Sequence, residues 1–237
     1  MPALESNLDV SSEAFEKNRA DMQDLLETMN GLLAEAAEGG GPEATARLRS
    51  RNKMPIRERI AHVLDRDSPF LEISPLAAWR SPFAVGSGFV VGIGVIKDVE
   101  CVILGHDPSV RAGAFNQFNS KKLMRGLQIS RENRLPYIQF VESAGADLRG
   151  QGSDEDPEEA IQREIGHFAE SGRLFYEITE LSKMGIPTVS LVFGASTAGG
   201  AYQPGMSDYN ILIKNQSRVF LGGPPLVKMA TGEDADP

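Results

Sequence analysis

Residues 194–202 read Gly-Ala-Ser-Thr-Ala-Gly-Gly-Ala-Tyr and directly follow an apolar strand pattern at residues 186–193. Their small side chains stand where a helix should begin, and glycine lets a substrate oxygen come within hydrogen-bonding distance of main-chain N–H groups. The first N–H groups of a helix have no partner inside it and carry a partial positive charge. We therefore predict that this turn stabilises an enolate or alkoxide oxygen without a charged side chain.

Two other interpretations of the same turn stay open. The pattern Gly194-x-Ser196-x-Ala198 is one residue away from the G-x-S-x-G nucleophile elbow. In elbow enzymes the catalytic histidine follows the serine, whereas all the histidines of this chain precede Ser196: His62, His106 and His167. The simplest alternative is a turn that only packs a helix tightly against a strand.

The composition is that of an ordinary globular protein. The chain has 237 residues, 41% of them hydrophobic and 24% charged, which is enough for a sizeable core. A net charge of −9 disfavours nucleic-acid binding, so an anionic substrate needs a local basic patch. Cys101 is the only cysteine, which excludes internal disulfides and multi-thiolate zinc sites, and we expect no metal. We see no export signal or membrane-length apolar run, and expect a cytoplasmic (in eukaryotes, mitochondrial matrix) protein with no membrane partner.

Helical periodicity comes first along the chain. Apolar residues at helical spacing predict an amphipathic helix over residues 11–37, which Gly39-Gly40-Gly41-Pro42 stops. A second helix is expected to about residue 51 and a third over residues 55–64. We expect these helices to pack on the core or on a partner, with residues 1–50 forming an N-terminal helical layer.

Strand and helix patterns then alternate. Strands are expected at residues 70–73, 89–96, 99–104, 135–141, 186–193, 211–214 and 218–221, with a hairpin turn at Lys97-Asp98. Helices are expected at residues 118–133 and 157–184, shortly after Gly199 and from Pro224. This alternation predicts an α/β fold, a layered β-sheet with flanking helices, whose ligand site lies at the carboxyl ends of its parallel strands.

A second small-residue turn supports the oxyanion prediction. The expected strand that ends at Val141 runs into Glu142-Ser143-Ala144-Gly145-Ala146-Asp147-Leu148. Because parallel strands end at the same edge of a sheet, the two turns can supply two donors to one oxygen. Glu142 is the only acid immediately beside the turns, and we expect it to close the strand end rather than to act as a base.

Taken together, these motifs resemble the carboxyltransferase (beta) subunit of biotin-dependent acyl-CoA carboxylases, a branch of the crotonase-like superfamily. The sequence around the glycine pair and near residue 224 looks closest to the methylcrotonyl-CoA carboxylase type, and propionyl- and acetyl-type relatives share much of it. The segments that carry the resemblance stand in the family's order: Lys53-x-Pro55-x-Arg57-Glu58-Arg59-Ile60, Ser143-Ala144-Gly145-Ala146, Ser196-Thr197-Ala198-Gly199-Gly200-Ala201-Tyr202 with Pro204, Met206-Ser207-Asp208, and Gly222 to Lys228 followed by Ala230-Thr231-Gly232-Glu233.

The resemblance implies a crotonase-like (ClpP/crotonase) N-terminal carboxyltransferase domain over residues 51–237. It implies transfer of CO₂ from carboxybiotin to the α or vinylogous γ carbon of an acyl-CoA, with the amides of Gly199 and Gly200 holding the thioester oxygen as the enolate forms. Substrate contacts are implied for Gly145, Ala146, Thr197, Ala198, Ala201 and Tyr202. The chain departs from the family's usual Ser-Gly-Gly-Ala at Ala144, whose β-carbon restricts positive φ and weakens the expected donor role of Gly145 and Ala146.

The resemblance also implies partners. Biotin would sit on a biotin carboxylase or biotin carrier subunit, since the chain has no Ala/Val-Met-Lys-Met biotinylation stretch. Family members carry a second crotonase-like half, so we expect a fragment or one product of a split gene, lacking its own C-terminal half and its homo-oligomer partners. Two other functions stay open: a crotonase-like hydratase or isomerase, which needs a base beside the α-carbon, and a non-catalytic assembly subunit.

Overall fold

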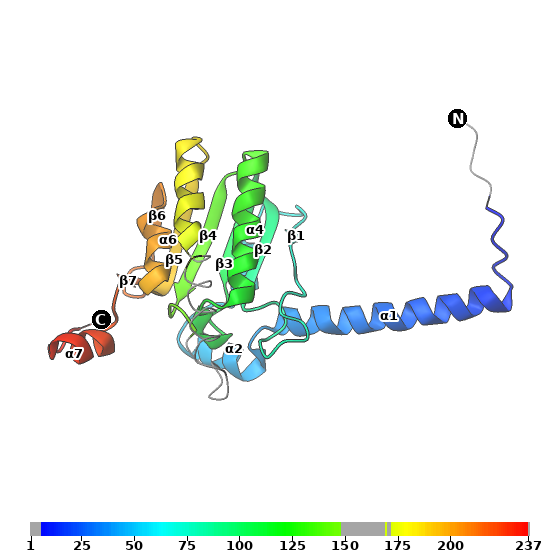
Figure 1. Cartoon of the computed structure of the whole chain (residues 1–237), viewed down its shortest axis with the longest axis horizontal. Coiled ribbons are helices and arrows are strands. Elements are labelled where there is room, and N and C mark those ends of the chain that lie inside the picture. The colour runs from blue at the N-terminus through cyan, green and yellow to red at the C-terminus, as the bar shows by residue number, and fades with distance from the viewer. Residues whose placement is uncertain (1–5, 148–168, 170–171, 237) are drawn as a thin grey trace.

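The fold is built on one mixed sheet with helices on both of its faces (Figure 1). A computed structural model describes residues 6–147, 169 and 172–236. Its strands are β1 (Leu71–Glu72), β2 (Phe89–Ile96), β3 (Val99–His106), β4 (Tyr137–Ser143), β5 (Thr188–Thr197), β6 (Tyr209–Leu212) and β7 (Arg218–Phe220). Its helices are α1 (Glu13–Glu38), α2 (Gly41–Ser50), α3 (Ile56–Val63), η1 (Arg111–Gly113), α4 (Gln117–Asn133), η2 (Ala198–Ala201), α6 (Tyr202–Gly205), α7 (Pro224–Thr231) and a helix over residues 172–183.

The strand order places β4 and β5 side by side within the sheet. The order is β1-β2-β3-β4-β5-β6, and β7 pairs with the far end of β5. Pairing is antiparallel from β1 to β3 and parallel from β3 onward. The hairpin between β2 and β3 turns at Lys97 and Asp98, which both have positive φ, and their N–H groups each donate to the Asp65 carboxylate at 2.7 Å. The predicted hairpin and the predicted α/β class are confirmed.

Two apolar clusters hold the layers together. One lies between the sheet and the pair formed by α4 and the helix of residues 172–183, with Leu127, Tyr137 and Ile178 fully buried. The other lies under α3 on the opposite face, where Ile56 and Ile60 pack against Ile103 and Phe140. Burying apolar side chains on both faces stabilises the central strands, which is why β2 to β4 read as nearly continuous apolar runs.

The three N-terminal helices differ in how much of their apolar surface is buried. Helices α2 and α3 bury Leu48, Ile56 and Ile60, but the only buried residue of α1 is Ala36. Figure 1 shows α1 as a long rod that runs away from the sheet. Its apolar stripe, including Met22, Leu25, Leu26 and Met29, is exposed. None of the described helices is long and apolar enough to cross a membrane.

Several predicted boundaries are wrong by a few residues. Strand β5 continues past Phe193 to Thr197, and β6 begins at Tyr209 rather than at Ile211. The helix expected after Gly199 begins at Ala198 instead, as one 3₁₀ turn followed by the four residues of α6. The first part of the helix expected over residues 157–184 lies outside the described residues.

Candidate functional site

The two small-residue turns lie next to each other at one edge of the sheet. Strands β4 and β5 run parallel, and Ser143 at the end of β4 is the register partner of Ser196 near the end of β5. An ideal β-carbon built on Gly145 would lie 3.4 Å from the carbonyl oxygen of Thr197, and one built on Gly200 would lie 3.1 Å from Cβ of Ser143. The predicted convergence of the turns is therefore confirmed.

The turn after β5 is fixed by Ser196. This serine is fully buried, and its Oγ donates to the carbonyl of Gly200 at 2.8 Å, closing the turn across four residues. Ala198 takes up the left-handed conformation at φ 52°, which lets the chain leave β5 and enter η2. A buried hydroxyl that already donates to the main chain is poorly placed to attack a substrate, so the structure speaks against the nucleophile-elbow hypothesis.

The two glycines of this turn have different surroundings. Gly200 is buried, and a β-carbon there would lie 3.1 Å from both Cβ and Oγ of Ser143 and 3.6 Å from the ring of Phe115. Gly199 is exposed, and a β-carbon there would have no neighbour within 4 Å among the described residues. Gly200 therefore makes the close contact between the turns, whereas no other described residue packs against the outer side of Gly199.

The turn after β4 has alanine at position 144, where it departs from the Ser-Gly-Gly-Ala pattern, and glycine at position 145. Positive φ falls on Gly145, at 91°, and not on Ala144, so the alanine is accommodated without strain. The N–H of Gly145 donates to Ser143 Oγ at 3.1 Å, and the carbonyl of Gly145 accepts from Phe115 N at 2.8 Å. Ala146 forms an isolated parallel bridge with Phe115. A donor role for Gly145 and Ala146 toward substrate stays a prediction, and the N–H of Gly145 is already used within the turn.

The other predicted contact residues flank the glycine pair. Thr197 and Ala198 are half-buried at the end of β5, and Ala201 is buried. Tyr202 is 43% exposed, and its ring lies against Phe175 of the helix of residues 172–183, with centroids 4.6 Å apart. These positions bring all the predicted residues of this turn to one edge of the sheet, and their contact with substrate stays a prediction.

A buried amide network that the sequence analysis missed anchors the short helix α6 to the sheet. Gln139 Nε2 donates to Ser190 Oγ at 2.8 Å, to Ser207 Oγ at 2.9 Å and to the carbonyl of Gln203 at 3.1 Å. Gln203 Nε2 returns a bond to Gln139 Oε1 at 2.9 Å. The available signal was Gln139 itself, because a glutamine inside an apolar strand pattern needs buried partners.

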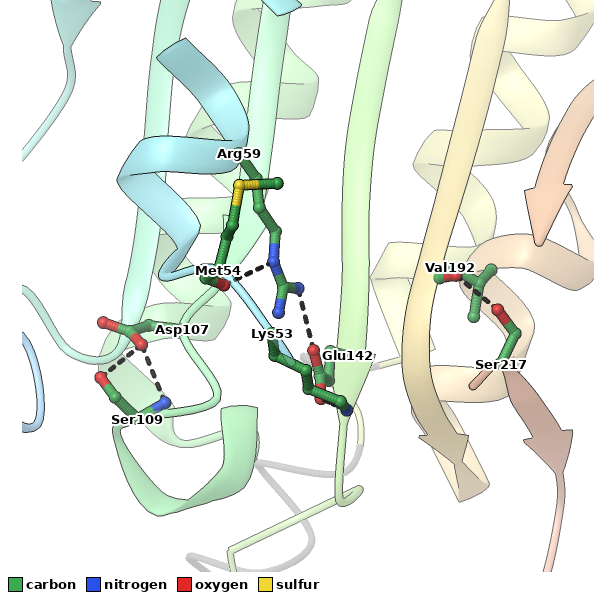
Figure 2. A network of polar contacts seen from close by, with 8 residues as sticks. All are labelled: Lys53, Met54, Arg59, Asp107, Ser109, Glu142, Val192 and Ser217. Atoms are coloured by element: carbon green, nitrogen blue, oxygen red, sulfur yellow. Dashed lines mark hydrogen bonds and ion pairs between the residues drawn. The ribbon is translucent and has the colours of Figure 1, made fainter. Parts of the chain in front are cut away.

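Three charged side chains meet where β4 ends (Figure 2). Glu142 pairs with Lys53 and, at 2.9 Å, with Nη1 of Arg59, whose Nε donates to the carbonyl of Met54 at 2.8 Å. The carboxylate is thus held by two cations from the segment that leads into α3 and from α3 itself. The prediction that Glu142 closes the strand end agrees with these contacts. Among the described residues no group of three or more His, Cys, Asp or Glu side chains could hold a metal ion.

The buried histidine nearest to the turns does not serve as a base. His106 ends β3, stacks on Phe89 with ring centroids 4.3 Å apart and meets the edge of Phe115. Burial lowers the pKa of His106 to about 3, so its imidazole stays neutral and takes up no proton at neutral pH. The described part of the site therefore offers main-chain donors and small side chains, which suit an oxyanion, rather than an acid–base pair.

Comparisons with known proteins agree with this geometry. The family model described as the carboxyl transferase domain matches residues 47–237. A protein of Mycobacterium tuberculosis named as a probable biotin-dependent acyl-coenzyme A carboxylase beta2 subunit is 49% identical over 98% of this chain. The mitochondrial methylcrotonoyl-CoA carboxylase beta chain of Arabidopsis thaliana is 39% identical, also over 98% of this chain.

The solved structures give the same result. The crystal structure of the geranyl-CoA carboxylase beta subunit of P. aeruginosa matches with a TM-score of 0.84 and 36% identity over 99% of this chain. The chain spans 42% of that structure, 42% of the mycobacterial relative and 38% of the plant relative. It thus corresponds to about two fifths of the length of these relatives.

Proposed function

Since this chain belongs to the carboxyl transferase family, we propose that it forms the acyl-CoA half of a carboxyltransferase site, in which CO₂ is transferred to a carbon of an acyl-CoA. The single observation that carries the proposal is the convergence of the β4 and β5 turns beside Gly199, whose outer side no other described residue covers. In this proposal residues 51–237 are the N-terminal carboxyltransferase domain, and residues 1–50 are a helical segment that precedes it.

The chain's own part in the reaction is to hold an oxygen. A thioester that enters beside Gly199 would place its carbonyl oxygen at the amides of Gly199 and Gly200. Gly199 is the second residue of the 3₁₀ turn η2, so its N–H has no partner one turn earlier, whereas the N–H of Gly200, the third residue, is the first that can donate to the carbonyl of the N-cap residue Thr197. Removal of the α or vinylogous γ proton puts negative charge on that oxygen, and fixed N–H donors stabilise this charge more than they stabilise the neutral thioester. The enolate carbon then attacks CO₂.

Biotin fits this site as a group brought by a partner. It would supply the CO₂, and the relatives named above are called biotin-dependent or are carboxylase beta chains. The two acids of the β4 turn, Glu142 and Asp147, are each paired with a cation. This suits a reaction in which the base that accepts the substrate proton would also come from elsewhere, with the biotin group once it has released CO₂. We propose a biotin-carrying subunit, the remaining length of a carboxylase beta subunit and further copies of the chain as its partners.

A hydratase or isomerase on the same fold is not favoured. Such an enzyme needs a carboxylate or another base at the substrate α-carbon. The candidate acid, Glu142, is paired with Lys53 and Arg59 and packs against the backbone of Gly194, so it is committed to contacts within the protein. The non-catalytic assembly role is not favoured either, because the outer side of Gly199 is not covered by any other described residue.

The proposal is tested by assembling the chain into a complete beta subunit with its biotin-carrying subunit. We expect labelled bicarbonate to enter acid-stable acyl-CoA product when ATP and a branched or linear enoyl- or acyl-CoA are supplied. Water addition to a double bond without label incorporation would favour the hydratase instead. If no label enters the product with any of a panel of short-chain, branched and isoprenoid CoA thioesters, the proposal is contradicted.

A further inference from the structure

The end of β5 contains a bulge that the sequence did not predict. Val141 is the partner of Val192, but Ser143, two residues later, is the partner of Ser196, four residues later. Glu142 therefore stands alone opposite the segment Phe193 to Ala195. Extra residues of this kind change the direction of a strand and set where the following side chains point, so this bulge determines how the Gly199–Gly200 turn approaches β4.

The carboxylate of Glu142 occupies the place that a side chain would need at the centre of the bulge. A β-carbon on Gly194 would lie 2.5 Å from Oε1 and 2.7 Å from Cδ of Glu142. The φ angle of Gly194 is not positive, so the glycine is not required for its backbone conformation. It is required because Glu142 packs directly on the main chain of the bulge.

Arg59 contacts both strands, β4 and β5, at the bulge. Its guanidinium pairs with Glu142 on β4 and lies over the ring of Phe193 on β5, 4.5 Å from the ring centroid. The Arg59 side chain is 2% exposed, so these are buried contacts. Lys53 adds a second cation on the other carboxylate oxygen. Figure 2 shows both cations reaching the carboxylate from the N-terminal side of α3 and from α3 itself.

The bulge is coupled to the oxyanion turn by short contacts. Ser196, two residues after Gly194, donates to the carbonyl of Gly200. Ser143, the residue after Glu142, lies so close to Gly200 that a β-carbon on Gly200 would be 3.1 Å from its Cβ and Oγ. We infer that Glu142 is a positioning residue: clamped by Lys53 and Arg59, it fixes the β5 bulge and through it the orientation of the Gly199 and Gly200 amides. This inference rests on the proposed function.

The test uses a substitution that keeps the shape of the side chain. Glu142→Gln still fills the space over Gly194 but no longer pairs with two cations. The matched control is Glu58→Gln in the same region, because Glu58 pairs with Arg49 at the surface, with side chains 43% and 55% exposed. Both variants are made in the assembled holoenzyme. Two CoA ligands are compared by calorimetry: a thioether analogue of the acyl-CoA, and a nitronate analogue that carries the charge of the enolate.

A positioning role predicts that the variant loses kcat and nitronate preference while substrate binding changes little. In Glu142→Gln we expect kcat for carboxyl transfer to fall at least about tenfold, because small misplacements of a catalytic group cost up to about 10²-fold. The KM and the affinity for the thioether should change less than about threefold, while the preference for the nitronate falls by the same factor as kcat. Glu58→Gln should match the wild type in all four quantities.

Other results would overturn the inference. An unchanged nitronate preference in Glu142→Gln would show that the clamp does not orient the amides, and an equal loss of both ligands would show a merely structural role. If Glu142→Gln does not fold, Gly194→Ala decides. Its methyl group would push the Glu142 carboxylate out of place, so the nitronate preference should fall while the thioether affinity changes little, and an unchanged preference in folded Gly194→Ala would contradict the inference. A wild type without nitronate preference would instead contradict the proposed function, and the inference with it.

Discussion

The glycine pair allows fold and function to be perturbed separately. Gly199→Ala adds a methyl group that meets no atom of the described residues within 4 Å, and the φ angle of Gly199 is not positive. The free energy of unfolding should therefore stay the same or rise by about 0.4–1 kcal/mol, as for glycine replaced by alanine at a compatible site. The same methyl group stands on the open side of the turn, where the thioester oxygen is expected. If it displaces the oxygen from one donor, kcat should fall about 10²–10³-fold.

Gly200→Ala is the natural comparison. Its methyl group would lie 3.1 Å from Cβ and Oγ of Ser143, about 0.7 Å inside an ordinary carbon–carbon contact. Overpacking of this kind costs about 1–3 kcal/mol, so this variant should lose stability as well as activity. Urea unfolding of the chain and carboxyl transfer by the holoenzyme measure the two effects. Wild-type kcat in a stable Gly199→Ala holoenzyme would refute the oxyanion assignment.

Three further predictions concern neighbouring groups. Ser196→Ala should cost about 1–3 kcal/mol of stability, because the carbonyl of Gly200 loses its hydroxyl donor. The variant should nevertheless keep a large part of kcat. Complete loss of turnover with acyl-CoA binding intact would revive the nucleophile hypothesis. Burial holds the folded-state pKa of His106 near 3, so between pH 6.5 and 3 the unfolded chain binds up to one proton more than the folded chain. The free energy of unfolding should therefore fall by up to about 1.4 kcal/mol per pH unit as the pH drops. His106→Phe should remove this contribution in urea titrations at pH 7, 6 and 5, and an equal pH dependence of stability in the variant and the wild type would contradict it. Ala198→Gly should be neutral or stabilising by up to about 1 kcal/mol in chemical denaturation, since Ala198 has φ 52°, whereas a clear loss would show that the left-handed conformation carries no strain.

Much of the sheet could be predicted because its signals are local. The pattern over residues 89–96 gave both ends of β2, and Lys97-Asp98 gave the hairpin, because a two-residue turn with positive φ favours Asp. The end of β5 could not be predicted in this way. Gly194 has the character of a turn residue, whereas it continues the strand, and its missing side chain leaves room for Glu142, 52 residues earlier. Such a contact between distant segments leaves no periodicity in the sequence.

In the candidate site, too, the features with a local sequence signal could be predicted and the contacts between distant segments could not. The sequence located the glycine turns and their shared edge, because both follow strand patterns that must lie in parallel. It could not separate open Gly199 from packed Gly200, since the difference depends on Ser143 and Phe115 of other elements. It also gave no reason for α1 to leave its apolar stripe exposed, because amphipathic periodicity indicates a face to be covered but not what covers it.

The most direct test of the central claim is a structure of the assembled beta subunit with a bound, non-hydrolysable acyl-CoA analogue. We predict that the carbonyl oxygen of the analogue lies about 2.7–3.1 Å from the main-chain nitrogen of Gly199, Gly200 or both, with the acyl chain on the open side of Gly199. A carbonyl oxygen bound away from this turn, with these amides facing only protein, would contradict the account.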